Sequence, residues 1–95
     1  MDRIKAILEE VFSLTIDWCA SCENDLVGCA TISCNLCVNI WASEDKAEVR
    51  LINPTPYKED ITKTMRDYIP CLFSYSNVKE VKKITSRLVI KFKDL

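Results

Sequence analysis

The chain has 95 residues, among them six cysteines, one glycine, three prolines and no histidine. Lys and Arg number 13 against 14 Asp and Glu, so the net charge is -1, and 48% of the residues are apolar. A chain of this length and composition buries enough surface for one core, which excludes a multidomain enzyme, a disordered tail and a fibrous rod. We therefore expect a single domain over residues 1–95.

The first elements in chain order are a helix and three strands. Apolar residues recur at three- and four-residue steps from Ile4 to Val11, a spacing that is typical of an amphipathic helix. The pattern then alternates with a period of two, as in half-buried strands, over residues 14–22, 30–40 and 46–52. The connections between these runs are too short for parallel crossovers, so we expect an antiparallel meander.

A second helix and two further strands follow. Thr55 and Pro56 form a helix-start signal. The apolar stripe of this helix consists of Tyr57, Ile61, Met65, Tyr68 and Leu72. The proline after Ile69 disfavours helical geometry at that residue and should end or kink the helix. The last strands are predicted over residues 78–84 and 87–94. The result is an α+β fold of order α-β-β-β-α-β-β, an antiparallel sheet of about five strands with both helices packed on one face.

The cysteines form the most specific pattern in the sequence. Two CxxC pairs, separated by eleven residues, are made by Cys19, Cys22, Cys34 and Cys37. Two such pairs can supply the four thiolates of a structural zinc site. Both pairs fall inside predicted strands, however, where residues three apart point to opposite faces. The alternatives are unlinked, buried thiols and a disulfide between Cys19 and Cys29, both expected on the outer face of adjacent strands.

No set of catalytic residues is recognisable. Cys71 stands alone, and a catalytic cysteine needs a base, usually histidine, which the chain lacks. With Gly28 as the single glycine, a glycine-rich phosphate loop is excluded. The paired acids of the sequence are typical of exposed helix and turn surfaces. We therefore expect a protein that is not an enzyme.

Charge is distributed unevenly along the chain. Residues 1–60 contain five Lys and Arg against eleven Asp and Glu, whereas residues 61–95 contain eight against three. The basic residues gather in the final hairpin at Lys79, Lys82, Lys83, Arg87, Lys91 and Lys93. Such lysines protect a sheet edge from aggregation, and they also suit the phosphates of a nucleic acid. Near them in sequence, Tyr75 is the one aromatic residue placed to stack on a base.

The expected location is the cytosol. Charged and apolar residues alternate from Asp2 onward, unlike in a signal peptide, and no apolar run approaches the ~20 residues of a membrane helix. Cytosolic thiols stay reduced. The absence of Gln and the single Gly favour a thermophilic source, where intracellular disulfides also occur, while five Asn and the cysteines themselves count against it.

The expected function is therefore binding. We expect a small, non-enzymatic, cytosolic protein-binding module of adaptor or inhibitor type, which binds another protein or a second copy of itself through its sheet. Trp41, on the more polar side of its strand, is the expected anchor, since Trp is favoured at interface centres. The alternatives are a nucleic-acid-binding module that uses the basic hairpin and a metal- or redox-linked protein that uses the cysteines.

Overall fold

The computed structural model describes residues 2–13, 15–19, 25–33, 36–43, 45–52 and 60–93. The first half comprises helix α1 (Asp2–Phe12) and strands β1 (Asp17–Cys19), β2 (Leu26–Ser33), β3 (Leu36–Ala42) and β4 (Lys46–Leu51). The second half comprises helix α2 (Ile61–Tyr68), the short 3-10 helix η1 (Pro70–Phe73), and strands β5 (Val78–Ile84) and β6 (Arg87–Phe92). The six strands form one antiparallel sheet in the order β1-β2-β3-β4-β6-β5.

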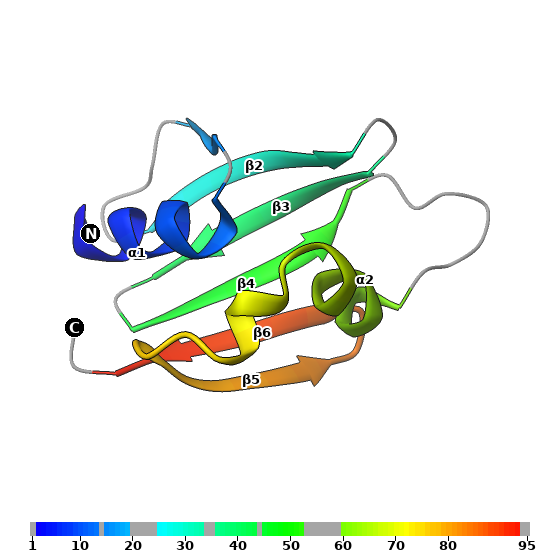
Figure 1. Cartoon of the computed structure of the whole chain (residues 1–95). Coiled ribbons are helices and arrows are strands. Elements are labelled where there is room, and N and C mark those ends of the chain that lie inside the picture. Colours follow the sequence, from blue (N-terminus) through cyan, green and yellow to red (C-terminus); the bar gives the residue numbers. More distant parts are fainter. Residues whose placement is uncertain are drawn as a thin grey trace.

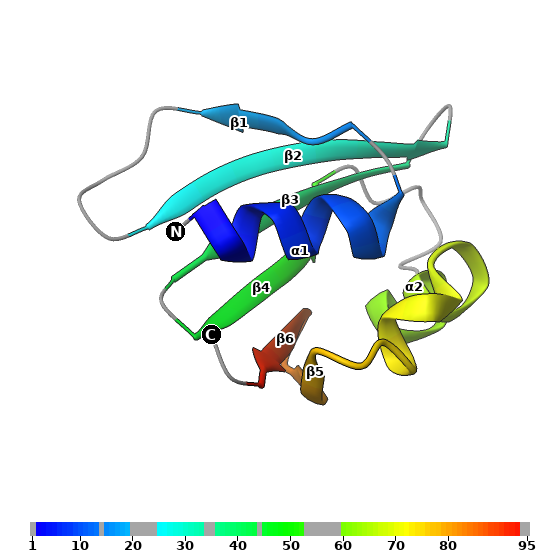
Figure 2. The same ribbon diagram turned by 60° about the vertical axis from the view of Figure 1, so that its left-hand side comes forward.

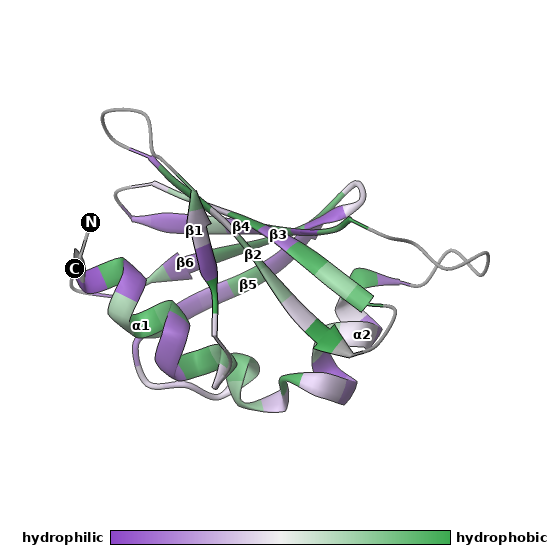
Figure 3. Ribbon diagram, turned by 90° about the horizontal axis from the view of Figure 1, so that it is seen from above, coloured by the Kyte–Doolittle hydropathy of each residue, from purple (hydrophilic) through white to green (hydrophobic). Residues whose placement is uncertain are grey.

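Both helices pack on the same face of this sheet (Figure 1 and Figure 2). Figure 3 shows the sheet as one layer and the helices as a second layer on one side of it. No element in the described part of the chain covers the opposite face. The sheet is therefore buried on one side, which is common for antiparallel sheets in α+β folds.

The core fills the space between the sheet and the helices. Successive residues of a strand point to opposite faces, so each central strand contributes alternate residues to it. Helix α1 contributes residues at three- and four-residue steps, as its sequence predicts. The largest fully buried side chains are Leu8, Val11, Val38, Ile40, Val49, Met65, Leu72, Leu88 and Ile90.

The predicted fold class is confirmed, but the sheet has six strands rather than five. The run 30–40, predicted as one strand, belongs to two strands, because Ser33 pairs with Leu36 and the chain reverses between them. The pairs Ala30–Val38 and Thr31–Cys37 join residues that are an even number of positions apart, so the apolar alternation continues across the hairpin and hides it. Of the first predicted strand, 14–22, residues 15 and 16 lie outside β1, and residues 14 and 20–22 lie outside the described residues.

Helix α2 also differs from the prediction. Its predicted start lies in residues 53–59, outside the described residues, and the described helix begins at Ile61. Asp60 caps it, since the Thr62 backbone N–H donates to its carboxylate at 2.9 Å. Tyr68, predicted in the apolar stripe, is 53% exposed. It is the last residue of α2, which ends before the proline as predicted, and residues of the following turn fill the core in its place.

A close contact at Gly28 joins strand β1 to the rest of the molecule. Gly28 lies opposite Trp18 in the ladder. A Cβ atom at this position would stand 2.7 Å from Cε3 of Trp18 and 3.0 Å from the carbonyl oxygen of Asp17. The indole N–H of Trp18 donates to the Glu9 carboxylate of α1 at 2.8 Å. The glycine thus makes room for an indole that links the edge strand to the helix.

The substitution Gly28→Ala tests this contact. The added methyl group has to displace the indole or the backbone of β1, which should lower the free energy of unfolding by about 1–3 kcal/mol. Urea unfolding followed by circular dichroism measures the change. In a Trp18→Leu background the same substitution should cost less, because the smaller side chain can move aside. An equal cost in both backgrounds would contradict the role assigned to the indole.

Candidate binding face

The candidate site is the uncovered face of the sheet, which we call the open face. Cross-strand partners share a face, so the register defines its members. On the central strands it brings Asn39, Arg50 and Arg87 into one row, and Trp41, Glu48 and Val89 into the next. Among the described residues, the strand ladders place on the open face Asp17, Cys19, Val27, Cys29, Thr31, Cys37, Asn39, Trp41, Lys46, Glu48, Arg50, Glu80, Lys82, Ile84, Arg87, Val89 and Lys91.

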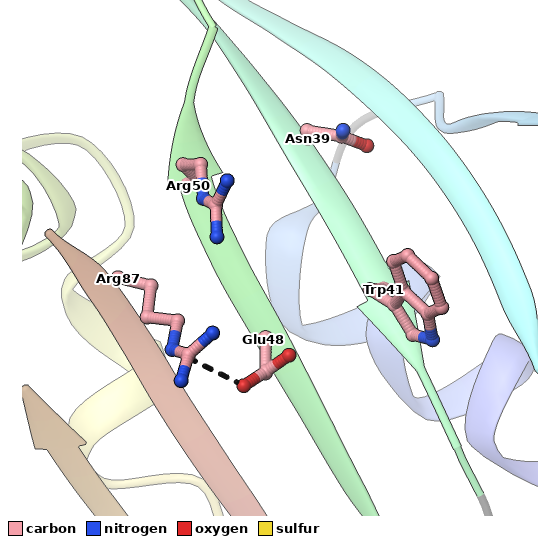
Figure 4. A pocket seen from close by; sticks show the side chains of 5 residues that line it. All are labelled: Asn39, Trp41, Glu48, Arg50 and Arg87. Atoms are coloured by element: carbon pink, nitrogen blue, oxygen red, sulfur yellow. Dashed lines mark ion pairs between the residues drawn. The ribbon is translucent and has the colours of Figure 1, made fainter. Parts of the chain in front are cut away.

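A depression of about 290 Å³ lies in the open face. Its lining comes from three neighbouring strands: Asn39 and Trp41 from β3, Glu48 and Arg50 from β4, and Arg87 from β6 (Figure 4). Trp41 is 51% exposed. The depression therefore combines one large aromatic ring with four polar or charged side chains, which makes it more polar than a usual small-molecule pocket.

Two like charges stand opposite each other in this depression. Arg50 and Arg87 are direct partners in the β4–β6 ladder, a placement in which like charges repel. Glu48 offsets part of this repulsion, since its Oε1 lies 3.3 Å from Nε of Arg87. That contact lacks the alignment of a hydrogen bond, and the buried Nε has no acceptor among the described residues. Arg50 is exposed and forms no ion pair with a described residue.

The basic residues of the β5–β6 hairpin lie on different surfaces of the molecule. Lys82, Arg87 and Lys91 lie on the open face. There, Lys82 and Lys91 line a smaller depression of about 120 Å³ over β5 and β6. Lys79 and Lys93 are exposed at the opposite end of the hairpin from its turn. The predicted nucleic-acid residues therefore do not form one continuous surface.

Lys83 points toward the other side of the sheet. It is the ladder partner of the buried Leu88, and its Nζ lies 3.2 Å from the carboxylate of Asp60. The pKa of Asp60 is held below its ordinary value of 3.8, first by the hydrogen bond from the Thr62 backbone and then by Lys83. Lys83 thus pairs with the cap of α2 and lies apart from the open face.

The structure does not bring Cys19 and Cys37 together. Both lie on the open face, but Cys19 stands in the row of Trp41, four residues along β3 from Cys37. They are separated by about 13 Å along the strands and about 10 Å across them, whereas thiolates on one zinc each lie about 2.3 Å from the metal. Among the described residues no group of His, Cys, Asp or Glu could hold a metal ion. Cys22 and Cys34 lie outside that part of the chain.

The remaining cysteines carry free thiols. Cys29 lies on the open face next to β1, as predicted, but its ladder partner is Asp17, and Cys19 is paired with Val27. The two cysteines are therefore diagonal neighbours, and both are free, as is Cys71. The Cys71 thiol donates to the backbone carbonyl of Val11 at 2.9 Å, which links η1 to α1.

The sequence singled out Trp41 as a protein-binding anchor and Arg87 as a nucleic-acid contact, but not their neighbours in the depression. The alternation in β3 already puts Asn39 on the same side as Trp41, and that in β4 puts Glu48 with Arg50. What the sequence lacks is the strand order, which sets β4 beside β6. This pairing brings two arginines together that are 37 positions apart in the chain.

The comparisons with known proteins found no matching family model, curated protein or solved structure. None of the described helices is long and apolar enough to cross a membrane.

Because the paired arginines repel each other, replacing one of them should stabilise the protein. The substitution Arg50→Gln removes the repulsion from Arg87 and should raise the free energy of unfolding by a few tenths of a kcal/mol at low salt. Urea unfolding measures the difference, and added salt should shrink it because Arg50 is exposed. Arg3→Gln, on the exposed side of α1, serves as control. A clear loss of stability with Arg50→Gln would show that Arg50 supports the fold.

Proposed function

We propose that the protein is a non-enzymatic module that binds another protein on its open face, with Trp41 as the anchor. The observation that carries this proposal is the position of Trp41. It is half-exposed on a central strand, at the rim of the depression of about 290 Å³. Holding a large apolar ring in water has no benefit for folding, whereas Trp is among the residues that contribute most to interface centres.

The surroundings of Trp41 suit an interface of moderate polarity. Val89, in the same row, is buried although it lies on the open face. Charged side chains such as Lys46, Glu48 and Arg50 surround this apolar centre. A protein–protein interface commonly has an apolar core and a polar, solvated rim. The open face has the same arrangement.

We also propose that the protein has no catalytic activity and acts in the cytosol. The chain has no histidine, and the open face offers ion pairs and an aromatic ring rather than an activated nucleophile. The free thiols of the described cysteines fit the reducing cytosol, where we propose that the protein acts.

Nucleic-acid binding is the second candidate, because the strand order puts an aromatic residue on the same face as three basic residues of the hairpin. Trp41 lies on the same face as Lys82, Arg87 and Lys91. Two acids interrupt this surface, however, since Glu48 lies beside Arg87 and Glu80 lies 4.0 Å from Lys91. A nucleic-acid backbone needs a continuous basic track, so a protein partner fits better.

The substitution Trp41→Ala tests the proposal, with Tyr68→Ala as its matched control. Both aromatic rings are about half-exposed, but Tyr68 lies on α2, on the covered side of the sheet. Tagged wild-type protein and both variants are purified from native cells, and the affinity for each co-purified protein is then measured by calorimetry. Loss of Trp41 should cost about 2 kcal/mol, or roughly thirtyfold in Kd, and loss of Tyr68 should cost little.

Sedimentation of the pure protein shows whether the partner is a second copy of the chain. A monomer whose co-purified proteins bind both variants equally would refute docking on the open face. Binding of an oligonucleotide that is stronger than that of any protein and steeply weakened by salt would favour the second candidate.

A further inference from the structure

We propose that Asn39, Arg50 and Arg87 form a carboxylate-binding subsite, which receives one acidic side chain of the docked protein. Trp41 then packs against an apolar residue that neighbours this acidic residue in the partner. The inference rests on the proposed function, because it concerns the same open face. It specifies what chemistry the partner must present there.

The charge of the depression sets the charge of its ligand. Two guanidinium groups, Arg50 and Arg87, face one carboxylate, Glu48. The depression therefore carries an excess of one positive charge. Because Arg87 already contacts Glu48 and Arg50 forms no ion pair with a described residue, a single carboxylate beside Arg50 balances the site. It also screens the repulsion between the two arginines.

The donors of this row suit an oxyanion. A guanidinium presents parallel N–H groups that match the two oxygens of a carboxylate. The Arg50 guanidinium is exposed and that of Arg87 is partly exposed, and the Asn39 amide adds further donors from the strand next to Arg50. Figure 4 shows all three side chains on the same side of the sheet, with Trp41 next to Asn39 on β3.

The dimensions of the depression favour a peptide side chain over a nucleic acid. A volume of about 290 Å³ lies at the lower limit for ligand pockets, which suits one or two side chains. A nucleic acid brings one charge per nucleotide and stacks successive bases on aromatic rings. On the described open face Trp41 is the one aromatic residue, and Glu48 would repel a second phosphate.

A titration with capped dipeptides tests the subsite. The probes are acetyl-Leu-Glu-amide, its neutral counterpart acetyl-Leu-Gln-amide, and inorganic phosphate, all at equal ionic strength. Nitrogen-15 NMR follows the Nε–H signals of Arg50 and Arg87 and the indole signal of Trp41. The Glu peptide should shift all three signals to saturation, and the Gln peptide should bind at least about tenfold more weakly, because a charge-assisted hydrogen bond is lost.

Variants of the intact protein locate the effect. Arg50→Gln should weaken the Glu peptide at least about tenfold, whereas Arg3→Gln on α1 should leave its affinity unchanged. Equal affinity for the Glu and Gln peptides, or no saturable shift with either, would overturn the subsite. Tighter binding of phosphate than of the Glu peptide would also overturn it and assign the row to phosphorylated ligands.

The same variant separates this inference from the proposed function. A partner released by Trp41→Ala but retained by Arg50→Gln would leave docking on the open face intact and refute the carboxylate subsite. A partner insensitive to both substitutions would refute both. We expect both substitutions to weaken the complex, with each effect at least about tenfold.

Discussion

The structure depends on one constraint, which is that two short helices cover a six-stranded sheet on one side. Helix α1 has 11 residues and α2 has eight, and both lie on the same face (Figure 2). The inner strands β3, β4 and β6 bury residues beneath them, and this burial provides the main stabilisation of the fold. The remaining residues of each strand are not needed in the core, so the sheet presents them together as a second surface.

Residues on that second surface are arranged in ways that folding alone does not explain. Arg50 stands opposite Arg87, and Trp41 exposes half of its surface. Arrangements that lower stability, such as paired like charges and an exposed aromatic ring, tend to occur at functional sites, where binding compensates for the lost stability. The contrast with the covered side is clear, since Trp18 there packs over Gly28 and donates a hydrogen bond to Glu9.

The sequence predicts which face each residue takes more reliably than which residues meet. The period-two pattern correctly separates Val49 from Glu48 and Arg50, because side chains alternate along any strand. It does not reveal the reversal between Ser33 and Leu36, since pairs such as Ala30–Val38 join residues an even number of positions apart and so preserve the alternation. Strand order is equally hidden, because long-range pairing depends on how the whole sheet packs.

The residues of the candidate site could be predicted only in part, again because the sequence does not reveal which strands pair. Trp41 stood out by its residue type, but the pairing of β4 with β6, which brings Arg87 beside Arg50, could not be read from the sequence. The lysines of the hairpin looked like one patch in the sequence. The strand register divides them, and Lys83 pairs with Asp60 on the covered side. The alternation along a strand therefore identifies candidate residues, and the register between strands decides which of them lie side by side.

The most direct test of this account is the solvent accessibility of the two indole N–H groups in the free protein. A soluble gadolinium chelate accelerates the NMR relaxation of exposed protons, and each indole is assigned by its loss in a Trp→Phe variant. If the open face is uncovered, the Trp41 indole proton should relax much faster than that of Trp18, which is hydrogen-bonded to Glu9. Equal protection of both protons would show that the face is already covered, and would contradict the account.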